Sequence, residues 1–265
     1  MSLAPARVRL AYWWRHGRAA DLANPRLFTE WVQHRKLHDR DAKLPALTDK
    51  VAVKALVAAT LGPDWITPTL WHGAVLPPAP VAPLPLVVKA RHGCGHLLIV
   101  RTPAEWQEAR RETARWARAR YGRWLDEWAY AAVPRGLLVE PYLGEGERLP
   151  IDYKLFVFGG RVSHVQVHLD RATDHRWIVM DRAWRRASPP TDDPDPARPT
   201  SLPAMIAGAE LLAGSRDFLR IDLYQIAGRP RFGEITLYPG SGLLHVVPPS
   251  LDRHMGELWR RARGG

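Results

Sequence analysis

The chain has 265 residues, of which 46% are hydrophobic and 25% charged, a composition typical of a folded globular protein. Its single cysteine cannot form an internal disulfide, and no apolar run approaches the roughly 20 residues that span a bilayer. The 38 Lys and Arg against 27 Asp and Glu leave a net charge of +11. Such an excess indicates an anionic partner, such as a nucleotide, a nucleic acid, an acidic lipid or a polyanionic polymer. We expect a cytoplasmic enzyme or binding protein.

The first part of the chain predicts helices separated by short extended segments. Trp, Arg and His recur at helical spacing in residues 1–40, and VAVKALVAATLG (51–62) predicts a further helix that ends at a glycine. WITPTLWHG (65–73) predicts a short strand. The five prolines of LPPAPVAPLP (76–85) exclude a helix or a central strand, so this segment is expected to be an extended connector.

The rest of the chain predicts strands paired through glycine turns, with helices between them. LPLVVKARHGCGHLLIVR (84–101), YKLFVFGGRVSHVQVHLD (153–170) and FLRIDLYQIAGRPRFGEITLYPGSG (218–242) each predict a β-hairpin. Helices are expected over 103–128 and 202–214, and at the C-terminus. This order indicates an α+β fold rather than the regular alternation of a doubly wound parallel sheet.

Two carboxylates in the last predicted hairpin are candidates for a metal site. Asp222 and Glu234 lie on neighbouring strands. Because side chains alternate along a strand, Asp222 shares a face with Arg220, and Glu234 shares one with Thr236. Mg²⁺ is typically held by one or two carboxylates together with phosphate oxygens. The alternative is a surface ion pair with Arg220 or Arg231.

The first hairpin carries Lys89 in its strand and Gly93 and Gly95 in its turn. Glycines allow backbone N–H groups to approach an anion and the lysine adds a positive charge, so the motif predicts phosphate binding. An ordinary glycine-containing hairpin is the alternative. The surrounding HGCGH cluster suggests zinc, but a structural zinc site normally needs four ligands, and the sequence has no second CxxC or HxxxH cluster.

Two further segments place polar groups on predicted strands. LLVEPYL (137–143) predicts a buried strand that ends at Glu140, where backbone groups could face a purine ring, with Glu147 within reach of ribose hydroxyls. Lys154 is flanked by apolar residues, and a buried lysine is rare without an anion beside it. Every second residue of 164–170 is polar, which is typical of a strand that lines a wet cleft or lies on the surface.

The order of these features resembles the ATP-grasp superfamily, with spacings close to those of D-alanine–D-alanine ligases. The similarity is greatest to the TupA-like ATP-grasp family and runs from about residue 20 to residue 259, nearly the whole chain. It rests on eight blocks in order, namely NPRLF, LTDKVAVK, VVKARHGCG, LVEPYL, DYKLFVFGG, VQVHLDR, RIDLY and GEITLYPGSG.

The resemblance implies an ATP-grasp fold in which two α+β lobes clamp ATP between antiparallel β-layers. It divides the chain into an N-terminal helical and short-strand segment (1–75), a small lobe with the lysine strand and the glycine-rich turn (76–139), and a C-terminal lobe with the metal-binding hairpin (140–265). ATP and Mg²⁺ are the implied cofactors.

The resemblance also implies which residues bind the nucleotide. Lys89 would hold the α- and β-phosphates, Lys50 and Lys154 would contact phosphate, and the glycine turn would close over the triphosphate. Residues 140–143 would form the adenine hinge, and Glu147, or Glu145 in its place, would bind ribose. The full implied set is Lys50, Lys89, His92, Gly93, Gly95, Glu140, Pro141, Tyr142, Leu143, Glu147 and Lys154.

The metal ligands implied by the resemblance are Asp222, Glu234 and Thr236. Thr236 stands where the superfamily has an asparagine, and a hydroxyl is a poorer ligand than an amide oxygen. Arg220 would neutralise the transferred phosphoryl group, while Asp170 and Arg171 would face the substrate. The implied catalytic residues are Arg220, Lys154, Arg171 and Asp170.

Three functions follow as hypotheses. The first is an ATP-dependent carboxylate–amine ligase acting through an acyl-phosphate, whose substrates are a carboxylate and an amine acceptor. The resemblance suggests that it modifies a cell-surface polysaccharide or a lipid-linked precursor, from the cytoplasm or the inner membrane surface. The second is a kinase of the same fold that phosphorylates a sugar or polyol hydroxyl. The third is a basic nucleic-acid-binding module, which the carboxylates on the last hairpin disfavour.

Overall fold

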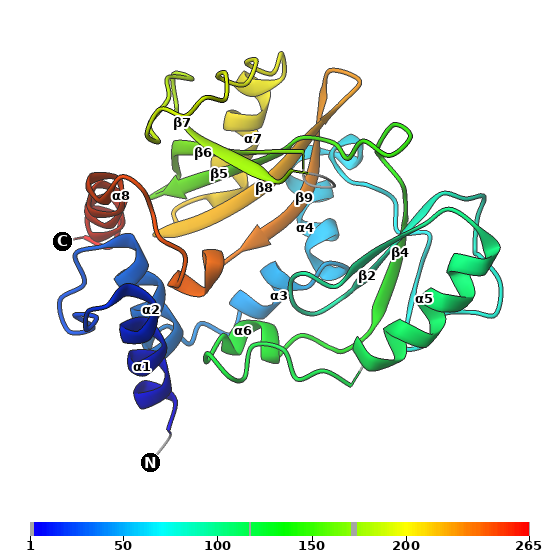
Figure 1. Ribbon diagram of the computed structural model, residues 1–265, viewed down its shortest axis with the longest axis horizontal. Helices are drawn as coiled ribbons and strands as arrows, with labels where there is room; N and C mark the ends of the chain where they lie inside the picture. The colour runs from blue at the N-terminus through cyan, green and yellow to red at the C-terminus, as the bar shows by residue number, and fades with distance from the viewer. Residues whose placement is uncertain (1–2, 117, 171–173, 265) are drawn as a thin grey trace.

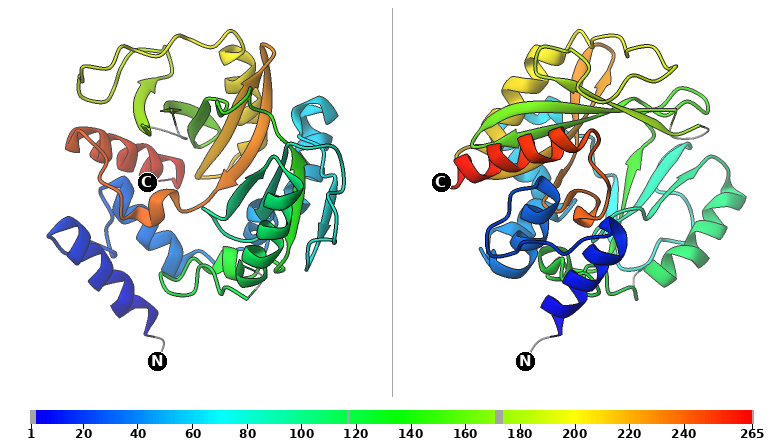
Figure 2. Two further views of the ribbon diagram at one scale, coloured as in Figure 1. Left: turned by 45° about the vertical axis from the view of Figure 1, so that its right-hand side comes forward. Right: turned by 60° about the vertical axis from the view of Figure 1, so that its left-hand side comes forward.

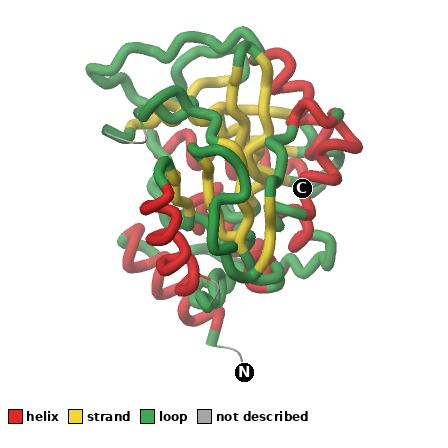
Figure 3. The backbone as a smooth tube through the Cα atoms, turned by 90° about the vertical axis from the view of Figure 1, so that its right-hand side faces the viewer, coloured by secondary structure: helices red, strands yellow, loops and turns green. Residues whose placement is uncertain are grey.

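The computed structural model describes residues 3–116, 118–170 and 174–264. Its strands form two antiparallel β-sheets with helices around them, which confirms the predicted α+β class (Figure 1). Figure 3 shows the strands of both sheets in yellow, with the helices in red at the periphery.

The smaller sheet has four strands in the order β1-β4-β2-β3. The strands are β1 (Trp71–Gly73), β2 (Leu86–Ala90), β3 (Leu97–Val100) and β4 (Leu137–Pro141). α5 (Pro103–Trp116) packs against this sheet, and its fully buried Trp106 shares a hydrophobic cluster with Val88 and Val139. The sheet takes strands from all three predicted segments of the chain, whose boundaries stay a prediction.

The larger sheet has five strands in the order β7-β6-β5-β8-β9. The strands are β5 (Asp152–Phe158), β6 (Arg161–Leu169), β7 (Arg176–Asp181), β8 (Phe218–Ile226) and β9 (Arg229–Thr236). α7 (Leu202–Ala213) packs against β5, β6 and β8, and its Met205 and Ala209 share the main core with Leu155. Because side chains alternate, Lys154 and its even-numbered neighbours on β5 point to the opposite face.

That opposite face is covered at one end by helices. α2 (Phe28–His38) and α8 (Pro249–Ala262) pack together there, and the rings of Phe218 and Trp259 lie 4.3 Å apart. This leaves the charged end of the face open toward the smaller sheet. The other helical segments are α1 (Ala4–His16), α3 (Leu44–Thr48), α4 (Ala52–Leu61), η1 (Pro63–Trp65), α6 (Trp128–Ala131) and η2 (Pro239–Gly242). Among the helices described, none has both the length and the apolar character that crossing a membrane requires.

Most predicted elements are confirmed, but the helix expected over 103–128 is wrong in its length. α5 ends at Trp116, and turns occupy most of 118–127 before α6 begins at Trp128. Gly122 has φ +79 and Asp126 has φ 56. A left-handed residue interrupts a right-handed helix, so this segment leaves the helical path. It forms a loop that lines part of the site described below.

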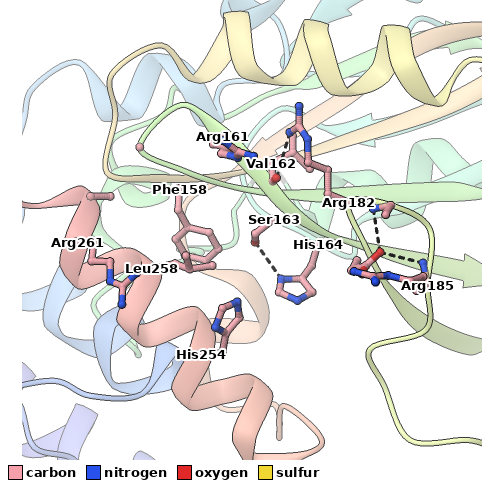
Figure 4. A pocket seen from close by; sticks show the side chains of 14 residues that line it. Phe158, Arg161, Val162, Ser163, His164, Arg182, Arg185, His254, Leu258 and Arg261 are labelled. Atoms are coloured by element: carbon pink, nitrogen blue, oxygen red, sulfur yellow. Dashed lines mark hydrogen bonds and ion pairs between the residues drawn. The ribbon is translucent and has the colours of Figure 1, made fainter.

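A pocket of about 770 Å³ lies between α8 and the β6–β7 edge of the larger sheet (Figure 4). Three of its four arginines already pair with carboxylates: Arg182 with Glu210, Arg185 with Asp181, and Arg261 with Glu257. These pairs reduce its capacity to hold an anion. His164 of β6 is buried in its wall, and its Nδ1 lies 2.9 Å from the Ser163 hydroxyl.

His164 predicts how the stability of the protein depends on pH. Burial, with a smaller contribution from nearby His254, lowers the pKa of His164 to about 4, against some electrostatic support from Asp181. The unfolded chain therefore takes up this proton first as the pH falls. We therefore expect protonation of His164 in the unfolded chain to lower the free energy of unfolding by about 2 kcal/mol between pH 7 and pH 5.

The measurement is the free energy of unfolding in urea at both pH values. His164→Gln should lose less stability than the wild type by about that amount. His72→Gln, which removes an exposed histidine on β1, should follow the wild type. An equal loss in His164→Gln and wild type would contradict the assignment.

Candidate active site

A cleft of about 360 Å³ lies between the two sheets. β2 and β3 of the smaller sheet supply one wall, and β5, β8 and β9 of the larger sheet supply the other. The residues that line it include Lys50, Val87, Lys89, Gly93, Gly95, His96, Ile99, Glu140, Tyr142, Asp152, Lys154, Asp222, Phe232 and Glu234. The cleft thus gathers residues from four sequence segments that were predicted separately.

The centre of the cleft floor is Asp222, which is 1% exposed. Its carboxylate accepts two hydrogen bonds from Arg220, both 2.7 Å, and one of 2.6 Å from the Lys154 ammonium. Burial alone would raise the pKa of Asp222, but Arg220 and Lys154 hold it well below its usual range. The carboxylate is therefore ionised at all physiological pH values.

Lys154 confirms the expectation that a buried lysine has an anionic partner. Its ammonium donates to Asp222 across the β5–β8 pair and to Asp152 at 2.7 Å. Although burial disfavours its charge, these carboxylates raise the pKa of Lys154. Asp152 was missed in the sequence, yet a signal exists. It lies two residues before Lys154, so period-two alternation places both on one face.

Glu234 lies opposite Asp222 in the β8–β9 ladder, and Thr236 lies opposite Arg220. A β-bulge between Asp222 and Leu223 shifts the register by one residue and brings Glu234, rather than Gly233, opposite Asp222. The Glu234 carboxylate has only long contacts, at 3.6 Å to Lys50, 3.8 Å to Arg220 and 3.5 Å to the Thr236 hydroxyl. The Thr236 hydroxyl also accepts from Arg220 at 3.0 Å. Glu234 therefore has lone pairs available for a cation.

The donors present fit a magnesium site. Two carboxylates on adjacent strands, supplemented by phosphate oxygens, are the ligands that Mg²⁺ prefers. Asp222 shares its oxygens with Lys154 and Arg220, and anionic phosphates would draw those cations away from it. Thr236 is buried with its hydroxyl bonded to Arg220, so the two carboxylates are the stronger donors.

Glu140 forms a second charged cluster in the wall opposite. Its carboxylate pairs with Lys89 at 2.6 Å and with Lys54 of α4. Burial raises the pKa of Glu140, but Lys89 and Lys54 more than offset this and lower it. Lys54 also donates to the Thr67 carbonyl at 2.7 Å and is not among the residues that line the cleft. Lys89 is thus the cleft-facing member of the pair.

The turn between β2 and β3 closes one end of the cleft. Gly93 and Gly95 have φ of +87 and +79, which favour glycine. Lys50 donates to the Gly93 carbonyl at 2.6 Å, which ties the start of α4 to this turn. His92, predicted beside these glycines, is 3% exposed and does not line the cleft, whereas His96 does.

The segment predicted to form the adenine hinge lines the cleft. Pro141, Tyr142 and Leu143 line the cleft with the side chains of Val87 and Ile99, which gives one end an apolar surface. A flat apolar slot beside an extended backbone suits a purine base.

Glu147 and Asp170, two further predicted site residues, do not line the cleft. Glu147 is exposed in the bend after the hinge, beside Glu145, and neither lines the cleft. Asp170 pairs with Arg176 at 2.5 Å, away from the cleft. Arg171 lies outside the described residues. The roles implied for these residues stay predictions.

A second pocket of about 560 Å³ adjoins the cleft and shares Cys94, Gly95, Lys154 and Glu234 with it. We call it the loop pocket. Residues 120–127 and η2 supply much of its remaining wall, and it is also lined by Tyr130, Arg220, Thr236 and Tyr238. Sequence reasoning missed this pocket because it expected a helix over 103–128.

Two buried charges support the wall of the loop pocket. The Lys36 ammonium donates to the carbonyl and hydroxyl of Ser241, both at 2.6 Å. Burial lowers the pKa of Lys36 to about 8 and raises that of nearby Glu127. Ser241 has φ 57, a strained conformation for a residue with a side chain. The bonds from Lys36 hold this backbone in place.

The site can therefore hold a polyanion and a cation beside a second ligand. Lys50, Lys89, Lys154 and Arg220 supply positive charge, and Asp222 and Glu234 are carboxylates that could hold a cation. Arg220 contacts both of these carboxylates and lines the adjoining pocket. The pocket of Figure 4 is larger, but Asp181 is the one carboxylate among its lining residues, and it is already paired with Arg185.

One solved structure supports the assignment of the fold. The L-amino acid ligase from Bacillus licheniformis aligns with a TM-score of 0.52 at 14% identity, over 81% of this chain and 50% of that one. D-alanine–D-alanine ligase from Bacillus anthracis complexed with ATP gives 0.48 at 16% identity, over 83% of this chain and 65% of that one. This chain thus spans half to two thirds of the length of those structures. The comparison with curated proteins finds no match.

The family comparison covers most of the chain. The model described as TupA-like ATPgrasp matches residues 30–260, a range that contains both sheets, the cleft and the loop pocket. With the two antiparallel sheets and the cleft between them, this match shows that the chain belongs to the TupA-like ATP-grasp family.

Proposed function

We propose that this protein is an ATP-dependent carboxylate–amine ligase that acts through an acyl-phosphate. The observation that carries the proposal is the cluster of Lys50, Lys154 and Arg220 around Asp222 and Glu234, between two antiparallel sheets and open to a second pocket. Lys89 adds a fourth cation from the opposite wall of the cleft. Family membership supports ATP as the nucleotide. This reaction needs no protein nucleophile, so the chemistry depends on positioning and charge neutralisation.

The cleft residues divide into base, phosphate and metal functions. Pro141 to Leu143 and the apolar side chains opposite would hold adenine. Lys89 and Lys154 would hold phosphate oxygens, with the Gly93–Gly95 turn above them. Asp222 and Glu234 would hold Mg²⁺, which supplies positive charge to the phosphates in such reactions.

Arg220 connects the two pockets in this proposal. A substrate carboxylate in the loop pocket would attack the γ-phosphorus, giving an acyl-phosphate and ADP. Arg220 would stabilise the negative charge that develops on the transferred phosphoryl group, since it lines this pocket beside both metal-binding carboxylates. An amine would then displace phosphate and form the amide.

The acceptor proposed is a cell-surface polysaccharide or its precursor, modified with an amino acid or a peptide. The net charge of +11 supports an acidic acceptor. A location in the cytoplasm, at the inner surface of the membrane, belongs to the same proposal.

The reaction class can be tested by hydroxylamine trapping with MgATP and a panel of amino acids and sugar acids. A ligase should give a hydroxamate together with ADP, because hydroxylamine captures the acyl-phosphate. Glu234→Gln should lower this signal by at least about 100-fold, because it removes a charge that holds the metal. ADP release that depends on a sugar or polyol, without hydroxamate, would instead indicate a kinase.

Glu108→Gln, which changes an exposed glutamate of α5, is the matched control and should leave the hydroxamate signal unchanged. Thermal unfolding of both variants shows whether they are folded. Full activity in a folded Glu234→Gln variant would contradict the metal assignment.

Lys89 and Lys54 allow a matched test of the phosphate role. Both pair with Glu140, but only Lys89 lines the cleft. Lys89→Ala should therefore weaken ATP binding, measured by calorimetry, by about tenfold or more. Lys54→Met should change ATP affinity less. Equal affinities of wild type and Lys89→Ala would remove Lys89 from the phosphate site.

A further inference from the structure

The outward face of α1 is apolar and has no packing partner among the described residues. The inward face buries Ala4, Val8 and Tyr12. The opposite side carries the residues that we call the α1 face: Leu3, Ala6, Leu10, Trp13 and Trp14, all exposed. Leu10 is 64% exposed and Trp14 is 79% exposed. A surface helix normally presents polar residues there, so this face is fitted to a ligand or a partner.

The loop of residues 118–127 extends the apolar surface. Trp124 is 74% exposed, and the Arg7 guanidinium lies 5.8 Å from the centre of its ring. Arg7 also donates to the Trp124 carbonyl at 3.1 Å. The α1 face and Trp124 therefore belong to one side of the molecule. In Figures 1 and 2, α1 lies beside α2 at the edge of the molecule, with its N-terminal end pointing away from both sheets.

The same two segments are strongly positive. Residues 3–20 contain four arginines and residues 113–125 contain four more, with no Asp or Glu in either segment. Together the two segments carry a local charge of +8, compared with +11 for the whole chain. In the described structure, Arg18 is the one among them that pairs with a carboxylate, that of Glu30 at 2.8 Å. The charges of Arg7, Arg9 and Arg15 on α1 are thus not neutralised by any carboxylate of the described residues.

α1 is also fixed to the rim of the loop pocket at both ends. Near its start, Arg7 bonds to the Trp124 carbonyl, and Trp124 lines the pocket. Near its end, the Arg15 guanidinium donates to the Leu243 carbonyl at 3.0 Å, and His16 lies 3.1 Å from the Gly242 carbonyl. Both carbonyls directly follow the η2 residues that line the pocket. Whatever the α1 face contacts is therefore held beside the entrance to this pocket.

We propose that the α1 face and Trp124 dock on the surface of an anionic lipid bilayer. Tryptophan prefers the membrane–water interface, where its ring is partly buried and its N–H stays hydrated. Arginines around an apolar helix face add attraction to acidic headgroups. A second copy of this chain would present the same α1 arginines, Arg7, Arg9 and Arg15, and their mutual repulsion disfavours pairing through this face.

This docking gives the loop pocket a direction. If the protein is the proposed ligase, the loop pocket opens toward the bilayer and receives a substrate whose lipid anchor stays in the membrane. A carboxylate or amine displayed just above the headgroups would enter past Trp124. A substrate free in solution would not require this orientation.

The test is cosedimentation of the full chain with vesicles of phosphatidylglycerol and phosphatidylcholine, compared with vesicles of phosphatidylcholine alone. Binding should require the anionic lipid and weaken as NaCl increases. The double variant W13S/W14S should lower the partition coefficient by at least about tenfold. Leu211→Ser, which removes an apolar residue that is 65% exposed on α7, should bind as the wild type does.

Light scattering and thermal unfolding of the same proteins complete the experiment. No binding of the folded wild type to anionic vesicles would overturn the proposal, as would undiminished binding of folded W13S/W14S. Self-association that W13S/W14S abolishes, without vesicle binding, would assign the face to a second copy instead. The assay contains no nucleotide, so its outcome is independent of the hydroxamate assay. A ligase that fails to bind vesicles would lose only the docking proposal.

Discussion

The ion pairs of Asp222 with Lys154 and Arg220 are the interaction on which the site depends. These groups lie on the central strands β5 and β8, in the middle of the larger sheet. An isolated charge there would be strongly unfavourable, so removal of one partner leaves the others uncompensated. The sheet supplies the register that brings them together, and the helices α2 and α8 close the apolar end of the same face. The β5–β8 register therefore determines both the packing of the sheet and the ion pairs of Asp222.

The positions of the metal-binding candidates could be predicted because β-strands repeat every two residues. That period places Arg220 beside Asp222, and the turn near Gly228 makes β8 and β9 neighbours. The pairing of Asp222 with Glu234 also depends on the β-bulge between Asp222 and Leu223, which the sequence pattern did not reveal. The buried Lys154 likewise indicated an anionic partner, but the pattern did not identify that partner. Such inferences succeed where residues share a strand face, and they fail to fix the register where a bulge intervenes.

Other parts of the site had no local signal. Glu140 meets Lys54 across 86 residues of sequence, and only the tertiary fold brings α4 to the hinge strand. Residues 118–127 contain good helix formers, yet Asp126 takes a left-handed conformation. That choice depends on packing against the rest of the molecule, which overrides local propensity. The loop pocket, and the position of α1 at its rim, could therefore be found only from the structure.

The internal pairing of the cleft cations has a consequence for ligand selectivity. Lys50, Lys89, Lys154 and Arg220 each have a carboxylate partner before any ligand arrives. A single small anion, such as inorganic phosphate or a free carboxylate, would have to compete with several of these carboxylates at once. A chelating polyanion that arrives with its own divalent cation exchanges all the partners together and leaves no carboxylate unneutralised. The pairing therefore favours a polyanion bound to a divalent cation over a single small anion.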